Sequence, residues 1–205
     1  RKVIHNVTRT AGVFFIKTIY SVLVSFFCIF ANVPFPFIPI QITLIDACIE
    51  AWPSFVTILE SDTRRIRGSF LKTALANALP FGVTAAGMIA AVSLVSPFTP
   101  AENRTVMYLL LIVISMTAVI KSCVPFTGLR VFICITMIIG TFGALVILPS
   151  LFEIVALSAW ERSYVLSGMV ICLAVAFVLE MGKRRIKNCA KENKNRNKEN
   201  LLNLL

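Results

Sequence analysis

The sequence predicts an all-α membrane protein: a bundle of six transmembrane helices with both termini cytoplasmic. Of its 205 residues, 58% are hydrophobic, and the mean hydropathy is +0.86, which is too apolar for an ordinary soluble domain. Long stretches carry no charge at all, and the basic residues gather at the ends of these stretches. This distribution is typical of helices that cross a bilayer.

Six stretches reach the roughly 20 mostly apolar residues that one span needs. They run near 11–31, 37–59, 69–95, 105–122, 128–148 and 163–181. When Lys and Arg are counted on alternate sides of these spans, 17 fall on one side, 2 on the other, and Lys17 lies within the first span. By the positive-inside rule the basic side is cytoplasmic, and an even number of spans puts both termini there.

The spans divide the chain into five parts. Residues 1–10 are a cytoplasmic stalk, and 11–59 hold the first two spans with the candidate site. Residues 60–68 form a basic cytoplasmic loop, and 69–182 hold the four supporting spans. Residues 183–205 are a basic, low-complexity cytoplasmic tail, for which we expect disorder or a fraying helical extension.

Two acids lie inside the second span. Asp46 and Glu50 are four residues apart, so they share one face of a helix. Each costs about 2.5 kcal/mol or more at bilayer depth unless something compensates the charge. Because two like charges on one face repel, the pair requires a cation, a proton or a basic partner. Intramembrane acids of this kind indicate a functional site.

Prolines flank the acidic pair. Pro39 precedes Asp46 by seven residues, and Pro53 follows Glu50 by three. Pro53 has no N–H to donate to the carbonyl of Ile49, so the helix loosens at the acids and carbonyl oxygens are freed. Carboxylates with free carbonyls suit hard cations such as Ca²⁺ or Mg²⁺. The alternative is an interhelical pair that protonation or a lysine neutralises.

The first span contributes further polar side chains. Lys17 either snorkels to the cytoplasmic interface or points inward to pair with an acid, and both remain open. Thr18, Ser21 and Ser25 share one helical face, which fits helix–helix hydrogen bonds or oxygen ligands beside the acids. Gln41, near the start of the second span, is expected to hydrogen-bond at the interface or behind the ligands.

The chain lacks the residues that several kinds of chemistry require. It has no Gly-x-x-x-x-Gly-Lys loop and no Ser, His and Asp set, so it predicts no catalytic residue and no bound cofactor, and it cannot hydrolyse ATP alone. No basic face with interleaved aromatics indicates a nucleic-acid partner. The six cysteines form no Cys-x-x-Cys pair, which argues against a disulfide framework or a thiolate metal site.

Two motifs resemble the C-terminal membrane region of P-type cation-transporting ATPases. Ile38-Pro39-Ile40-Gln41 and Asp46-Ala47-Cys48-Ile49-Glu50-Ala51-Trp52-Pro53 are similar to the start and unwound centre of their sixth helix, and residues 1–7 to the stalk of their fifth. Calcium pumps carry an Asn and an Asp four apart before a Pro, where this chain has Asp46 and Glu50. Lys17 and the loop 59–70 resemble the bacterial cation-transporting ATPase E group.

The resemblance implies helices five to ten of a pump in a bacterial plasma membrane. The parent would also need helices one to four, phosphorylation and nucleotide-binding domains, ATP and Mg²⁺. The implied ligands of the transported divalent cation are Asp46, Glu50, Thr18 and Ser21. Lys17 would tune the charge, and Pro39, Pro53 and Gln41 would shape the site. Ca²⁺ is the favoured ion, with Mg²⁺, Mn²⁺ and H⁺ left open.

Two other functions are compatible with parts of the sequence. An ion- or proton-coupled secondary transporter, complete at six spans, would need an initiating Met, whereas the chain begins at Arg1 and is interpreted as a piece of a longer protein. A non-transporting scaffold derived from a pump would have no use for two buried carboxylates. The pump fragment is therefore the preferred hypothesis.

Overall fold

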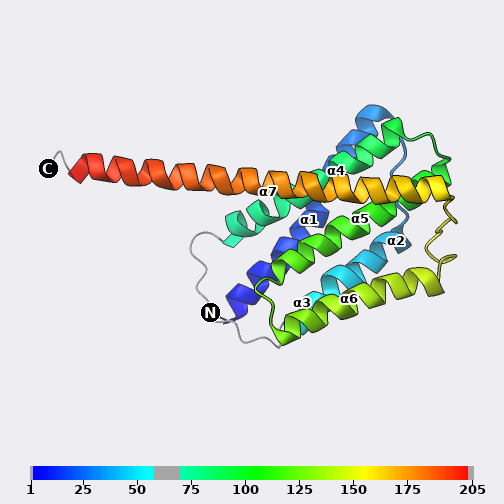
Figure 1. The fold of residues 1–205 in the computed structure, drawn as a ribbon, viewed down its shortest axis with the longest axis horizontal. Coiled ribbons are helices and arrows are strands. Elements are labelled where there is room, and N and C mark those ends of the chain that lie inside the picture. Colours follow the sequence, from blue (N-terminus) through cyan, green and yellow to red (C-terminus); the bar gives the residue numbers. More distant parts are fainter. Residues whose placement is uncertain (1, 58–69, 203–205) are drawn as a thin grey trace.

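The computed structural model describes residues 2–57 and 70–202, and the regular secondary structure of these residues is entirely helical (Figure 1). The predicted basic loop 60–68 lies outside the described residues. The all-α class is confirmed. In chain order the elements are α1 (Lys2–Ala31), α2 (Pro39–Leu44), the π-helix η1 (Ile45–Ala51), α3 (Trp52–Thr57), α4 (Phe70–Val95), α5 (Pro100–Ser122), α6 (Gly128–Ile147) and α7 (Ala159–Leu202).

Within the described residues, five helices are long and apolar enough to cross a membrane. Their spans are Phe14–Ala31, Ala74–Val95, Pro100–Ser122, Gly128–Ile147 and Ala159–Lys183. The second predicted span, 37–59, is helical from Pro39 to Thr57 but changes its hydrogen-bond register twice. It therefore appears as three short segments rather than one long helix. The count of six spans and the orientation of the termini stay predictions.

Helix α5 forms the centre of the bundle and contacts α4, α7, η1, α1 and α6. Val106, Tyr108 and Leu111 on α5 are fully buried. Its N-terminus is fixed by a capping box, in which the Thr99 hydroxyl accepts from the Glu102 N–H and the Glu102 carboxylate accepts from the Thr99 N–H. By contrast, α6 presents large apolar side chains outward, as expected where lipid is the solvent.

Helices α1 and α4 approach closely at a glycine. A Cβ added to Gly82 would lie 2.6 Å from Cγ2 of Ile19 on α1, so only glycine allows this contact. Pro80 lies inside α4, and the Thr84 hydroxyl donates to the Pro80 carbonyl at 2.7 Å. The close contact fixes α1 against α4 and so fixes the position of the polar residues on α1.

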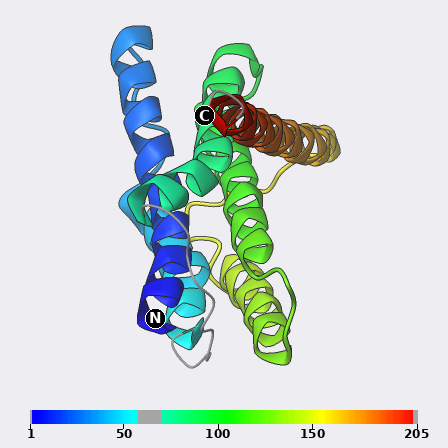
Figure 2. The same ribbon diagram turned by 90° about the vertical axis from the view of Figure 1, so that its left-hand side faces the viewer.

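Helix α7 continues well past its apolar span. Its apolar part ends at Lys183, and the helix runs on to Leu202. Figure 1 shows this extension projecting beyond the other helices, and Figure 2 shows α7 nearly end-on beside the bundle. Of the two alternatives for the tail 183–205, the structure describes the helical extension up to Leu202. Lys, Arg and Glu, which are frequent there, are good helix formers.

Candidate functional site

Both intramembrane acids lie on the π-helix η1. The N–H of Trp52 bonds the carbonyl of Ala47, five residues back, instead of the carbonyl four back as in an α-helix. The change of register falls just before Pro53, which has no N–H to continue the α pattern. Single-turn π segments inside α-helices occur frequently at functional sites. The second span therefore departs from α geometry where its two acids stand.

Hydroxyl groups bond backbone carbonyls on either side of Pro53. The Ser54 hydroxyl donates to the carbonyl of Glu50 at 2.5 Å, and the Thr57 hydroxyl donates to the carbonyl of Pro53, also at 2.5 Å. Near a proline in an apolar environment, where water is absent, such bonds give the carbonyl groups hydrogen-bond donors. They hold the irregular segment in a defined conformation.

Lys17 on α1 pairs with Asp46. Its Nζ donates to Oδ1 at 2.6 Å and to Oδ2 at 2.5 Å across 29 residues of sequence. The two side chains are 31% and 39% exposed in the structure. Of the two open alternatives for Lys17, the structure therefore shows the inward ion pair. Asp46 has its countercharge within the chain.

Glu50 differs from Asp46 because it is buried and incompletely paired. The residue is 4% exposed, and its Oε2 has no hydrogen-bond partner among the described residues. It interacts electrostatically with both Asp46 and Lys17. A buried carboxylate oxygen without a partner is costly. Glu50 thus has the capacity to bind a proton or a cation.

Tyr20 completes the polar group and is not among the site residues predicted from the sequence. It lies three residues after Lys17 on α1, is 1% exposed, and interacts electrostatically with Glu50 and Asp46. Its hydroxyl is buried without a hydrogen bond of good geometry to a described residue. The spacing of Tyr20 from Lys17 could have indicated it, since positions i and i+3 share a helical face.

The predicted ligands on α1 lie in different surroundings. Thr18 is exposed, and its hydroxyl donates to the carbonyl of Phe14 at 3.3 Å within the same helix. Ser21 is half-buried, and Ser25 is exposed. The buried face of α1 is formed instead by apolar residues and Tyr20. The structure brings Lys17, rather than Thr18, to the acids.

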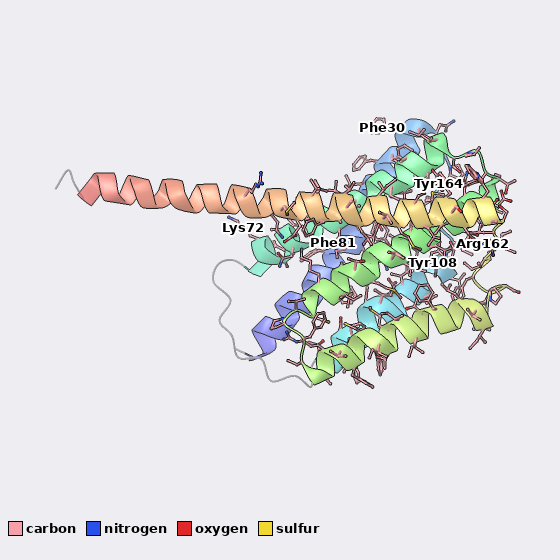
Figure 3. The ribbon with its side chains drawn as sticks, in the orientation of Figure 1. Phe30, Lys72, Phe81, Tyr108, Arg162 and Tyr164 are labelled. Carbon is pink, nitrogen blue, oxygen red and sulfur yellow. The ribbon has the colours of Figure 1, made fainter. Side chains whose placement is uncertain are left out.

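Gln41 holds the start of the second span in place. It is fully buried, and its Nε2 donates to the carbonyl of Phe152 at 2.9 Å. Its own carbonyl accepts from the Tyr108 hydroxyl at 2.9 Å; Tyr108 is labelled on α5 in Figure 3. Pro39 is the first residue of α2, a position where its missing N–H costs nothing. Both residues therefore set where the segment with the acids begins.

The described residues contain no group of three or more His, Cys, Asp or Glu side chains that could hold a metal ion. The polar group consists of one lysine, two carboxylates and a phenol on two neighbouring helices, surrounded by apolar spans. Such an arrangement is typical of a functional site in a membrane protein, because charged side chains inside apolar spans are costly and rare elsewhere.

Comparison with known proteins agrees with this class. No family model matches the chain. It is 32% identical over 192 residues to the probable cation-transporting ATPase exp7 of Streptococcus pneumoniae, a match that covers 87% of this chain and 25% of that relative. It is 33% identical over 94 residues to the calcium-transporting ATPase CtpE of Mycobacterium bovis, covering 40% of this chain and 12% of the relative.

The predicted resemblance to P-type cation-transporting ATPases is thereby confirmed. The chain spans about a quarter of the length of the exp7 relative, as a C-terminal membrane region would. A third relative, the calcium-transporting ATPase CtpE of Mycolicibacterium smegmatis, is 32% identical over 93 residues. Together with the five apolar helices among the described residues, these matches identify an integral membrane protein.

Proposed function

We propose that the chain is a membrane-domain part of an ATP-driven P-type cation pump and contributes carboxylate ligands to an intramembrane cation site. The observation that carries this proposal is Glu50, a buried carboxylate with an unpartnered oxygen on a π segment. The partial matches to cation and calcium pumps support it. Ca²⁺ is the proposed ion, because carboxylates with carbonyl oxygens favour hard cations.

The two acids have different roles in this proposal. Glu50 is the principal ligand, since it has no full countercharge in the described residues. Asp46 is held by Lys17, which acts as a built-in cation and limits how much charge the site can accept. Lys17, Asp46 and Glu50 carry one net negative charge, so a divalent ion needs further ligands from the rest of the parent protein.

Of the two proposed neutral ligands, Ser21 is better placed than Thr18. Ser21 is half-buried and lies four residues after Lys17, on the same side of α1. Thr18 would first have to give up its bond to the Phe14 carbonyl. Pro53 shapes the segment by interrupting the α register, while Pro39 and Gln41 fix its beginning.

The topology belongs to the same proposal. When 37–59 is counted with the five apolar helices, the chain has six spans. Both termini then face the cytoplasm of a bacterial cell, and the stalk 1–10 leads toward domains outside this chain. Those domains would bind ATP and Mg²⁺ and accept the phosphoryl group. Phosphorylation would then move the stalk and change access to the acids.

Transport by the intact protein containing this chain tests the proposal. ATP-dependent uptake of radioactive calcium into inside-out vesicles should fall at least about tenfold in the Glu50→Gln variant, equal to about 1.4 kcal/mol or more of lost binding. Glu153→Gln is the matched control, because Glu153 is exposed and pairs with Arg104 away from the acids. Equal uptake by wild type and Glu50→Gln would refute the proposed ligand role.

A further inference from the structure

A cavity separate from the acidic pair lies between α4, α5 and α7. Its volume is about 570 Å³, within the roughly 300–1,000 Å³ of small-molecule pockets. Its lining includes Phe81, Lys121, Leu173, Ala176, Phe177 and Glu180. None of the residues that line it belongs to the proposed cation site.

Most of the cavity wall is apolar, and one side opens toward the membrane. Ala176 is buried at its floor, while Leu173 and Phe177 on α7 are 38% and 64% exposed. On α7 these three positions lie within the apolar span Ala159–Lys183, so their surroundings in the membrane are acyl chains. The wall therefore suits one lipid chain.

Lys121 and Glu180 line the other end of the cavity, and Lys183, which is not itself a lining residue, joins them by pairing with Glu180. Lys121 Nζ lies 2.5 Å from Glu180 Oε2, and Lys183 Nζ lies 3.0 Å from the same oxygen. Lys121 also lies 4.9 Å from the centre of the Phe81 ring. Lys183 donates further to the carbonyl of Ala76 at 3.1 Å. Two cations share one carboxylate, so this cluster has one net positive charge.

The cluster lies at the ends of two apolar spans, where lipid headgroups are expected. Lys121 is in the last turn of α5, and Lys183 is the last residue of the apolar span of α7. The exposed cation Lys72 near the start of α4 lies at the same end of the bundle, as does Phe81 (Figure 3). Exposed Arg185 on α7 adds a further positive charge. Charge complementarity therefore favours an anionic headgroup.

We propose that this cavity binds one anionic phospholipid of the bilayer. The phosphate contacts Lys121 and Lys183 at the charged end, and one acyl chain lies along Phe81 and Phe177 over Ala176. Basic pockets between transmembrane helices on the cytoplasmic side are known to favour anionic headgroups. A zwitterionic lipid would make the same acyl-chain contacts but would be attracted little by the positive charge. An apolar transmembrane helix of a partner would not be attracted by that charge at all.

Native mass spectrometry of the intact protein released from vesicles tests the site. The vesicles contain phosphatidylglycerol and phosphatidylethanolamine in equal amounts, and the measured quantity is the ratio of the two lipids retained. We expect phosphatidylglycerol to dominate. Lys183→Gln should lower this ratio about fivefold, as expected for the loss of one interfacial cation. Arg162→Gln, at the opposite end of the α7 span, is the matched control and should leave the ratio unchanged.

Two further variants separate binding from misfolding. Glu180→Gln removes the carboxylate that Lys121 and Lys183 share, so it should raise the ratio about fivefold, a change that unfolding cannot produce. Ala176→Leu fills the cavity floor and should reduce retention of both lipids, whereas Ala174→Leu on the exposed side of α7 should not. Equal retention of the two lipids by wild type, or a ratio unaffected by Glu180→Gln, would overturn the proposal.

Discussion

Lys17 of α1 donates to both carboxylate oxygens of Asp46 on η1, at 2.6 and 2.5 Å. The pair joins the lysine of the first apolar segment to one of the two acids of the second. It also separates the roles of the two acids, because Asp46 has a fixed countercharge and Glu50 has an unpartnered oxygen. This asymmetry determines how the site should respond when single charges are removed.

Replacing Lys17 with Gln should increase cation affinity. The change releases Asp46 from its ion pair and raises the net negative charge of the polar group from one to two. We expect the apparent Kd for calcium binding to the intact protein to fall about tenfold, equal to about 1.4 kcal/mol. Equilibrium binding of radioactive calcium without ATP measures this. Lys17→Arg keeps the charge and should bind as wild type does; equal Kd values for Lys17→Gln and Lys17→Arg would contradict the charge-tuning role.

Removing the Tyr20 hydroxyl should weaken cation binding without weakening the fold. Tyr20→Phe keeps the buried ring but removes the polar atom that lies in the field of Glu50 and Asp46. In the proposed cation-bound site this hydroxyl supplies one polar contact, whose loss is typically worth about 1 kcal/mol, so calcium affinity should fall about fivefold. Tyr164→Phe is the control, because its ring packs edge-to-face against Phe98, with the centroids 5.1 Å apart, away from the acids. A loss of the same size in both variants would show a general effect.

Five of the six predicted spans correspond to long apolar helices among the described residues, because long uncharged runs leave few alternatives. The predicted ends at Ser122, Gly128 and Val95 agree with the ends of α5, α6 and α4. The site was harder to predict. Proline spacing pointed to a loosened turn at the acids, but nothing in the sequence specifies a π register. Which face of α1 turns toward the acids depends on Gly82 packing against Ile19, a tertiary contact that periodicity on one helix cannot show.

Filling the contact at Gly82 should destabilise the bundle. In Gly82→Ala the new Cβ would lie 2.6 Å from Ile19 Cγ2, so α1 and α4 must separate. Overpacking of this kind typically costs about 1–3 kcal/mol, which should lower the midpoint of thermal unfolding in detergent. Gly87→Ala on the same helix is the control, since nothing lies within 4 Å of its added Cβ. Equal midpoints for the two variants would show that α1 is not held at Gly82.

Restoring an N–H at position 53 should change the geometry of the acids. In Pro53→Ala the carbonyl of Ile49 regains an α-helical donor, which favours the α register over the π register of η1. Glu50 would then turn relative to Asp46, and calcium affinity should fall about tenfold, equal to about 1.4 kcal/mol.

Pro80→Ala in α4 provides a closely matched control for this substitution. Each proline lies inside an apolar helical segment, and each has its carbonyl bonded by a threonine four residues later, Thr57 in one case and Thr84 in the other. Only Pro53 adjoins the acids. Calcium binding should therefore weaken in Pro53→Ala and remain near the wild-type value in Pro80→Ala. If both variants kept wild-type affinity, the π segment would be dispensable for the site, and the acids would bind their cation from an ordinary α-helix.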